Sequence, residues 1–171
     1  MNGRAPAATA RLFLALWPDK ATRDAIAAWQ RRWTWPERAA VVGPERLHLT
    51  LHFIGQLPRA RLAEVSALLA VPHEPFEIAF GRAECWPRGL ALLMPQSLPE
   101  ALRALHRRLA AALAAAALPV DTRPFQPHCT LARQAVGAIP PPEPPALRWP
   151  VNGYALVESG RGYRVLQRYG G

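Results

Sequence analysis

One order of patterns occurs twice in this sequence, and it constrains the fold more than any other feature. Each half of the chain contains an apolar strand candidate, then a helix candidate that starts near a proline, then a strand with the pattern His-x-Thr. The first copy runs from Leu12 to His48 and the second from Leu90 to His128, which are spans of 36 and 38 residues. We therefore predict two similar lobes related by an approximate two-fold axis, with the His-x-Thr strands facing each other across a groove.

Hydrophobic periodicity predicts the remaining elements. Strand candidates lie at residues 11–16, 47–53, 76–80, 90–94, 125–132, 151–158 and 163–169. Helical spacing predicts helices after Pro18, Pro58 and Pro99, and Ser97 with Glu100 has the form of a capping box for the third. The last two strands flank a glycine-rich turn and form a predicted hairpin.

The third helix is predicted to be amphipathic. Its buried stripe consists of four leucines at helical spacing: Leu102, Leu105, Leu109 and Leu113. Arg103, His106 and Arg107 fall on the other side, which we interpret as a solvated face. Six prolines between residues 137 and 150 predict a loop in that segment.

Composition excludes several classes of protein. Half of the 171 residues are hydrophobic, which is enough for a core and excludes global disorder. The apolar runs are far shorter than the roughly 18 residues that span a bilayer, so no membrane-spanning segment is expected. Two cysteines are too few for a disulfide framework or a four-thiolate zinc site. Arg11 splits the first apolar stretch below the roughly 7–15 residues of a signal-peptide core, and we expect a cytoplasmic protein.

The formal net charge is +9, which is typical of proteins with polyanionic partners. Lys20 is the only lysine among 21 cationic residues, and proline is abundant. A GC-rich genome produces the same arginine-rich profile without selection for binding. The charge is therefore compatible with nucleic acid binding and does not establish it.

The two His-x-Thr segments carry the candidate chemistry. Residues i and i+2 of a strand share one face, so His48 lies beside Thr50, and His128 lies beside Thr130. Cys129 points to the other face and is predicted to be a small buried hydrophobe rather than a nucleophile. Each strand thus offers one imidazole and one hydroxyl to a groove. A lone His-x-Thr is usually incidental, but two copies in matching positions favour a shared function.

This combination suits the opening of a cyclic phosphodiester. The reaction needs a base for the attacking water and an acid for the departing alkoxide, on opposite sides of phosphorus. Histidine has an ordinary pKa of about 6.5, so one imidazole can be charged near neutrality while the other is not. Each proton transfer contributes roughly 10²–10⁴-fold in rate. The threonine hydroxyls would hold the non-bridging oxygens, and no metal or other cofactor is required.

Three stretches of this sequence resemble the two-histidine (2H) phosphoesterases, specifically the bacterial RNA 2′,3′-cyclic phosphodiesterases that are also called 2′-5′ RNA ligases. They are residues 11–15 (RLFLA), 47–55 (LHLTLHFIG) and 127–133 (PHCTLAR). The paired His-x-Thr motifs, 80 residues apart, are highly specific together, and the resemblance extends from about Arg11 to the last hairpin. It implies a bilobal α+β fold, with two antiparallel sheets lining a central groove and helices packed outside. Residues 1–171 would form one domain of two intertwined lobes.

The resemblance also implies an activity and the roles of the histidines. The expected reaction is hydrolysis of an RNA 2′,3′-cyclic phosphate end to a 2′-phosphomonoester. His48 would be the proton donor to the leaving oxygen, and His128 the proton acceptor from water. An RNA 5′-hydroxyl in place of water would give a 2′-5′ bond.

Three further residues are candidates for substrate contact. Arg133 completes the family's second motif, but strand alternation places it opposite His128, so it reaches the groove only if the strand bends or ends there. Phe13 could stack on a base or simply pack in the core. His52 shares the His48 face by alternation, about 13 Å along the strand, where it could touch substrate or cap the sheet.

Metal binding and two other functions are the alternatives. His48, His52 and His128 are available as ligands, but the first two lie on a strand and no HExxH pattern is present, so no metal site is expected. The chain could instead hydrolyse small cyclic phosphates derived from nucleotides or ADP-ribose. It could also bind RNA or nucleotide ends without turnover. A monomer suffices in every case, because one chain supplies both halves of the site.

Overall fold

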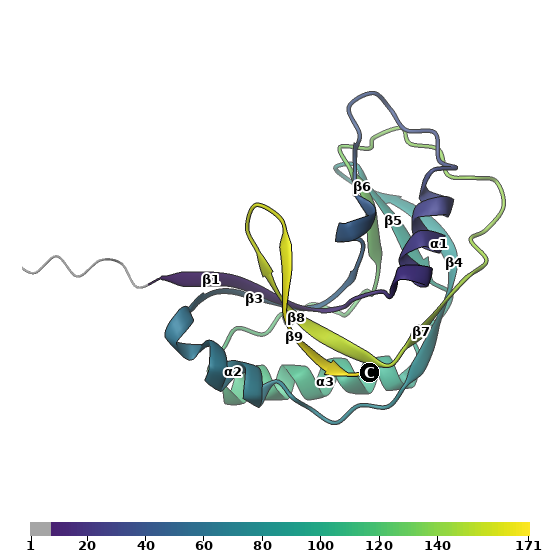
Figure 1. The fold of residues 1–171 in the computed structure, drawn as a ribbon. Helices are drawn as coiled ribbons and strands as arrows, with labels where there is room; N and C mark the ends of the chain where they lie inside the picture. The colour runs from purple at the N-terminus through teal and green to yellow at the C-terminus, as the bar shows by residue number, and fades with distance from the viewer. Residues whose placement is uncertain (1–7) are drawn as a thin grey trace, which may run out of the picture.

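A computed structural model describes residues 8–171 (Figure 1). This part of the chain contains nine strands: β1 (Thr9–Leu16), β2 (Ala40–Val41), β3 (Leu49–Pro58), β4 (Phe76–Trp86), β5 (Leu90–Pro95), β6 (Cys129–Arg133), β7 (Leu147–Val151), β8 (Gly153–Ser159) and β9 (Tyr163–Gly170). The same described residues form three α-helices: α1 (Lys20–Gln30), α2 (Leu62–Leu68) and α3 (Glu100–Ala115). Two short 3₁₀ helices, η1 (Pro44–Arg46) and η2 (Arg59–Arg61), precede β3 and α2.

The strands form one open sheet made of two antiparallel halves. The order is β7-β4-β5-β6-β3-β1-β8-β9, and β2 pairs with β6. The first half contains β3, β1, β8 and β9, and the second contains β7, β4, β5 and β6. The halves meet where β3 pairs with β6, through Leu49 and Cys129. The predicted α+β fold with two antiparallel sheets is confirmed, with the addition that the sheets are continuous at this pair.

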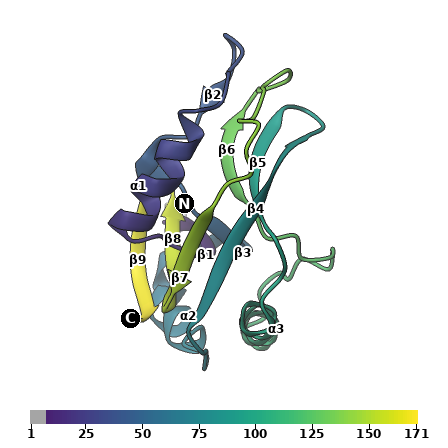
Figure 2. The same ribbon diagram turned by 90° about the vertical axis from the view of Figure 1, so that its right-hand side faces the viewer.

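Each half of the sheet is covered by a helix from the other half of the sequence. Helix α1 follows β1 but packs toward β6 and β7, and its Gln30 amide donates to the backbone carbonyls of Val42 and Leu131. Helix α3 follows β5 but contacts β3. Figure 2 shows α1 and α3 on different sides of the molecule. Because each helix covers the opposite half of the sheet, both sequence repeats contribute to the packing of each half.

The predicted helical stripe lies in the main core. All four of its leucines are fully buried. Burying a leucine side chain contributes roughly 1.5–3 kcal/mol, so this stripe is a large part of what fixes α3 against the sheet. No helix within residues 8–171 has the length and apolar composition needed to cross a membrane.

Two predictions about the ends of elements are wrong. The Ser97–Glu100 capping box does not form, because α3 begins at Glu100 after Pro99 and has no side-chain cap. The proline-rich segment also contains strand β7, with Pro150 opposite Glu77 of β4. Strand β7 is at the edge of the sheet, where a proline costs no ladder hydrogen bond.

A β-bulge follows each His-x-Thr segment. In β3, Thr50 pairs with Ala15 and His52 with Leu14 of β1, so Leu51 is an extra residue. A bulge reverses the face on which the later residues of the strand lie.

The second bulge has the same position in its repeat. In β6, Thr130 pairs with Leu92 and Ala132 with Ala91 of β5, so Leu131 is the extra residue. Leu131 and Ala132 are both buried, which breaks the alternation along β6. The two repeats therefore share the bulge as well as the sequence motif.

Candidate active site

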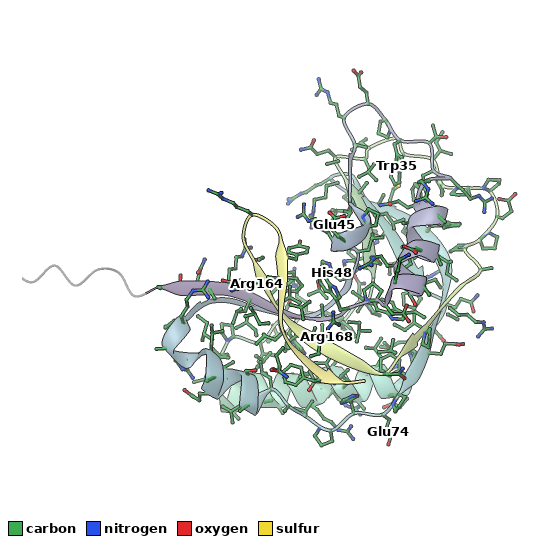
Figure 3. The ribbon with its side chains drawn as sticks, viewed as in Figure 1. Trp35, Glu45, His48, Glu74, Arg164 and Arg168 are labelled. Atoms are coloured by element: carbon green, nitrogen blue, oxygen red, sulfur yellow. The ribbon has the colours of Figure 1, made fainter. Side chains whose placement is uncertain are left out.

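The two histidines occupy equivalent places, each one residue before a strand of the sheet. His48 follows η1 and precedes β3 (Figure 3), and His128 precedes β6. Leu49 and Cys129 are paired and fully buried, so their neighbours point to the opposite side. We call this side of both half-sheets the histidine face.

Antiparallel pairing brings the four predicted residues together on this face. The residues on either side of a paired position lie across from each other in an antiparallel ladder. The Leu49–Cys129 pair therefore places His48 across from Thr130, and Thr50 across from His128. The charge of His128 is also close enough to lower the pKa of His48.

A backbone carbonyl fixes the tautomer of each imidazole. Nδ1 of His48 donates to the carbonyl of Arg46, and Nδ1 of His128 donates to that of Gln126, both over 2.7 Å. With the proton on Nδ1, Nε2 of the neutral ring is an acceptor. Nε2 of His48 lies 3.1 Å from the Thr50 hydroxyl, which donates to it. Both Nε2 atoms are thus set to exchange a proton with a bound group.

Burial and positive charge lower the pKa of both histidines. For His48, burial is the largest cause, and the charges of His128, Arg46 and Arg133 act in the same direction. For His128, burial again comes first, and Arg133 adds to it. Bonds to the backbone carbonyls oppose these effects without cancelling them. A bound phosphate would offset the positive charges and favour protonation of one imidazole.

Three aromatic rings surround His48. Phe13 of β1 lies 5.0 Å away between ring centroids, Trp17 stacks at 5.4 Å, and Tyr163 of β9 makes an edge contact at 5.2 Å. The guanidinium of Arg46 lies 4.8 Å above the Tyr163 ring. These contacts hold the imidazole from several sides, which supports a fixed orientation of Nε2.

The predicted stacking role of Phe13 is not compatible with its burial. Only 3% of its surface is exposed, and it belongs to a small apolar cluster with Ala15, Ala155 and Val157. Almost none of the ring is open to a base. Phe13 instead packs against His48.

Arg133 lies on the histidine face, although simple alternation predicts the opposite face. The bulge at Leu131 shifts the phase of β6 before Arg133 is reached. Its side chain is exposed, and its charge lowers the pKa of both His48 and His128. The sequence required a bend in this strand for Arg133 to reach the groove, and the bulge at Leu131 provides it.

Phe53 was missed by sequence reasoning. It occupies in β3 the place that Arg133 occupies in β6, five residues after the histidine and beyond the bulge. Its backbone pairs with Phe13, their rings are 6.3 Å apart, and Phe53 is 63% exposed. The phase change that exposes it cannot be read from the sequence.

Trp86 was also missed. Its ring, at the end of β4, lies 5.1 Å from that of His128. Strands at residues 76–80 and 90–94 were predicted, but the sequence gives no signal that the segment between them lies beside the second motif.

His52 and His106 differ from their predictions. The bulge at Leu51 turns His52 away from His48 toward α3, and only 3% of it is exposed. Its Nε2 donates to the carbonyl of His106 over 2.9 Å, and the two rings stack at 4.0 Å. His106 also stacks on Phe125 at 3.9 Å, so it is a packed residue rather than part of a solvated face. Burial lowers the pKa of His106 to about 4.

The donor sets for other chemistry are not assembled in the described part of the chain. Within residues 8–171, no three His, Cys, Asp or Glu side chains are grouped to hold a metal ion. Cys129 is fully buried, and burial raises the pKa of its thiol to about 12. This is the environment of a packing residue and not of a nucleophile.

Two imidazole–hydroxyl pairs on one face of paired antiparallel half-sheets define a two-histidine phosphoesterase. Residues 17–162 match the family model described as the 2′-5′ RNA ligase superfamily. The chain belongs to this superfamily.

Known proteins of similar sequence and structure agree with this assignment. The chain is 31% identical to the RNA 2′,3′-cyclic phosphodiesterase of Escherichia coli K12 over 150 residues, which cover 86% of this chain and 83% of that protein. It is 34% identical to the RNA 2′,3′-cyclic phosphodiesterase of Thermus thermophilus, covering 93% of this chain and 89% of that protein. The crystal structure of E. coli LigT with 3′-AMP superimposes with a TM-score of 0.84 at 27% identity, covering 95% and 98% of the two chains.

Proposed function

We propose that this protein hydrolyses RNA 2′,3′-cyclic phosphate ends to 2′-phosphomonoesters by general acid–base catalysis between His48 and His128. The observation that carries the proposal is the matched pair of imidazoles beside the Leu49–Cys129 pair, each anchored through Nδ1 with Nε2 available. Relatives named RNA 2′,3′-cyclic phosphodiesterase, similar over most of the chain, support the same substrate.

The two histidines divide the proton transfers. Nε2 of His128 takes a proton from water as the water oxygen attacks phosphorus. Nε2 of His48, protonated in the complex, gives its proton to the 3′-oxygen as the bond between phosphorus and that oxygen breaks. In-line displacement requires the two groups on opposite sides of phosphorus, and each transfer contributes roughly 10²–10⁴-fold in rate.

Hydroxyls and one guanidinium hold the phosphate. Thr50 and Thr130 donate to the non-bridging oxygens, and Thr50 exchanges its bond to His48 for this contact. Arg133 adds a positive charge to the same oxygens, where negative charge grows in the transition state. The Arg133 charge already acts on both imidazoles.

Phe53 is proposed to provide the stacking surface, a role for which Phe13 was one candidate in the sequence. Its exposed ring lies on the histidine face next to Phe13, on the side of His48. The leaving 3′-oxygen belongs to the terminal ribose, so the terminal base lies on this side. Stacking tolerates any base, because every base has an aromatic face.

The test is turnover of an oligoribonucleotide that ends in a 2′,3′-cyclic phosphate, with EDTA present throughout. We expect a 2′-phosphate product, and a loss of at least about 10²-fold in kcat for His48→Ala or His128→Ala. His73→Ala is the matched control, since His73 bonds to the carbonyl of Asn152 and contacts Tyr154, away from the site. Binding without turnover in the wild type would refute the proposal in favour of a binding module. Activity that EDTA abolishes would refute the metal-free mechanism.

We also propose a substrate, an oligomeric state and a cellular location for the enzyme. RNA with a 2′,3′-cyclic phosphate terminus is the substrate, and small cyclic nucleotides are compared with it in the same assay. A monomer is sufficient, because one chain supplies both histidines. We propose that the enzyme acts in the cytoplasm.

A further inference from the structure

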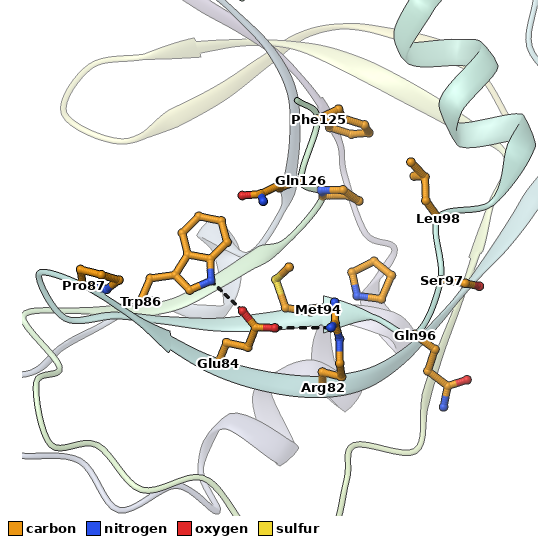
Figure 4. A pocket seen from close by; sticks show the side chains of 12 residues that line it. Arg82, Glu84, Trp86, Pro87, Met94, Gln96, Ser97, Leu98, Phe125 and Gln126 are labelled. Carbon is orange, nitrogen blue, oxygen red and sulfur yellow. Dashed lines mark hydrogen bonds and ion pairs between the residues drawn. The ribbon is translucent and has the colours of Figure 1, made fainter. Parts of the chain in front are cut away.

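A pocket of about 540 Å³ lies beside His128, and the proposed hydrolysis does not use it (Figure 4). We call it the Trp86 pocket. The residues that define it here are Arg82, Glu84, Trp86, Leu98 and Phe125. Its volume is in the range of about 300–1,000 Å³ that is typical of small-molecule sites.

The pocket belongs to the histidine face. Glu84 of β4 pairs with Leu92 of β5, which pairs with Thr130 of β6, so the three side chains form one row on the same side of the sheet. Trp86 lies two residues beyond Glu84 on this side and contacts the ring of His128. Gln126, which also lines the pocket, holds Nδ1 of His128 through its carbonyl. The pocket therefore adjoins the imidazole of His128, which contacts the Trp86 ring in the pocket wall.

Its lining fits a flat, uncharged ring with hydrogen-bond donors. Trp86, Phe125 and Leu98 supply aromatic and aliphatic walls. The Glu84 carboxylate accepts a hydrogen bond from Trp86 Nε1 over 2.7 Å and faces the Arg82 guanidinium at 3.7 Å. The Arg82 and Glu84 charges balance, so the pocket does not favour a phosphate. A carboxylate acceptor between apolar walls suits a nucleobase with an exocyclic amino group.

The geometry of the in-line reaction indicates which nucleotide would place its base in the Trp86 pocket. The leaving 3′-oxygen lies at His48, so in-line attack places the nucleophile at His128. Water has no group to place in a pocket, whereas an RNA 5′-hydroxyl has a base one ribose ring away. We propose that the Trp86 pocket binds the 5′-terminal base of a second RNA, whose 5′-hydroxyl replaces water in the reaction. The inference rests on the proposed function of the two histidines.

The resulting step is balanced without a cofactor. The 5′-oxygen forms a bond to phosphorus, and its proton passes to Nε2 of His128. The bond between phosphorus and the 3′-oxygen breaks, and the 3′-oxygen takes the proton of His48. The product is a 2′-5′ phosphodiester with a free 3′-hydroxyl.

The experiment compares two reactions of the same enzyme. Hydrolysis is measured with a cyclic-phosphate oligoribonucleotide alone, and ligation with the same strand plus a 5′-hydroxyl oligoribonucleotide as acceptor. Leu98→Trp fills the pocket, and Glu84→Gln removes the charged acceptor. The matched control is Leu68→Trp on α2, where Leu68 is 46% exposed and does not line the pocket.

We expect a selective loss of ligation. Leu98→Trp raises the KM for the acceptor about tenfold, the size of one lost stacking contact, while kcat/KM for hydrolysis stays within about twofold. Wild-type enzyme prefers acceptors that begin with adenine, cytosine or guanine over uracil, and Glu84→Gln reduces that preference. The Glu84→Gln arm keeps the proposal testable if Leu98→Trp does not fold.

The other outcomes overturn the inference. A parallel loss of hydrolysis and ligation in both variants assigns the pocket to the cyclic-phosphate strand, and no loss in either shows that RNA does not use it. Hydrolysis without any ligation at saturating acceptor rejects the pocket proposal and leaves the hydrolase standing. Absence of hydrolysis itself rejects the proposed function instead.

Discussion

Leu49 and Cys129 are backbone partners at the point where the two halves of the sheet meet, and each directly follows a proposed catalytic histidine. Both side chains are fully buried. The same pair therefore joins the halves, anchors them in the core and sets the spacing of the imidazoles. The packing of the core and the relative positions of the two histidines therefore depend on one contact.

Truncation at this pair is expected to reduce the stability of the fold. Leu49→Ala removes methyl groups from a fully buried side chain, so we expect a loss of about 2–5 kcal/mol in the free energy of unfolding. Urea denaturation measures it. Leu68→Ala, at an exposed leucine, is the control and should change stability by about 0.5 kcal/mol or less. An equal effect of the two substitutions would contradict the importance of the pair.

Arg133 is expected to control the titration of both histidines. Its charge disfavours imidazolium, so Arg133→Gln should raise the pKa of His48 and of His128. NMR titration of the imidazole signals in the free protein measures both midpoints, which should lie below 6.5 in the wild type. Unchanged midpoints in the variant would show that Arg133 lies away from the phosphate site.

The stack of His52, His106 and Phe125 predicts a loss of stability in acid. The pKa of His106 is lowered to about 4, by burial first and by the charge of His52 second, whereas an unfolded histidine titrates near 6.5. The unfolded chain therefore takes up the proton first, and stability falls as the pH drops from about 6.5 to about 4. The slope is at most about 1.4 kcal/mol per pH unit for this residue, and solvent near the ring reduces it.

The substitution that tests this stack is His106→Phe. Phenylalanine preserves the stacking on Phe125 and cannot titrate, so the acid-dependent loss should become shallower while stability at pH 7 changes little. Urea denaturation at pH 7, 6, 5 and 4 gives the comparison. A wild-type slope that is retained in the variant would assign the acid sensitivity to other groups.

Phe53 and Phe13 are expected to affect different kinetic constants. Phe53→Ala should raise KM for the oligoribonucleotide about fivefold to a hundredfold, because one stacking contact is lost, with a smaller effect on kcat. Phe13→Leu should instead lower kcat, because Phe13 contacts the His48 ring and is itself covered. Steady-state kinetics of both variants separates binding from positioning. A KM effect for Phe13→Leu and none for Phe53→Ala would reverse the assignment.

Much of the local structure could be predicted from the sequence. The apolar alternation before and after each motif marks the strands, and the leucine spacing of α3 marks its buried side, because strand and helix periods are properties of adjacent residues. The cap of α3 was not predictable in the same way. Ser97 fits a capping pattern, but Pro99 and the packing of α3 decide where the helix begins.

The site residues likewise divide into those that local strand alternation predicts and those that depend on bulges and strand pairing. His48, Thr50, His128 and Thr130 were predicted because residues two apart in a strand share a face. Phe53 and Arg133 lie past a bulge, and no residue type marks the bulge. Trp86 approaches His128 only through the pairing of β4, β5 and β6.

By itself, the sequence determined the two strand motifs, the residues that share one face within each motif and the class of chemistry they suit. Those properties follow from the two-residue period of a strand and from the side-chain chemistry of histidine and threonine. The tertiary structure alone decided that Leu49 meets Cys129, that two bulges turn Phe53 and Arg133 onto the histidine face, and that Phe13 is covered. Contacts between segments 80 residues apart arise from the packing of the whole core, which no local pattern contains.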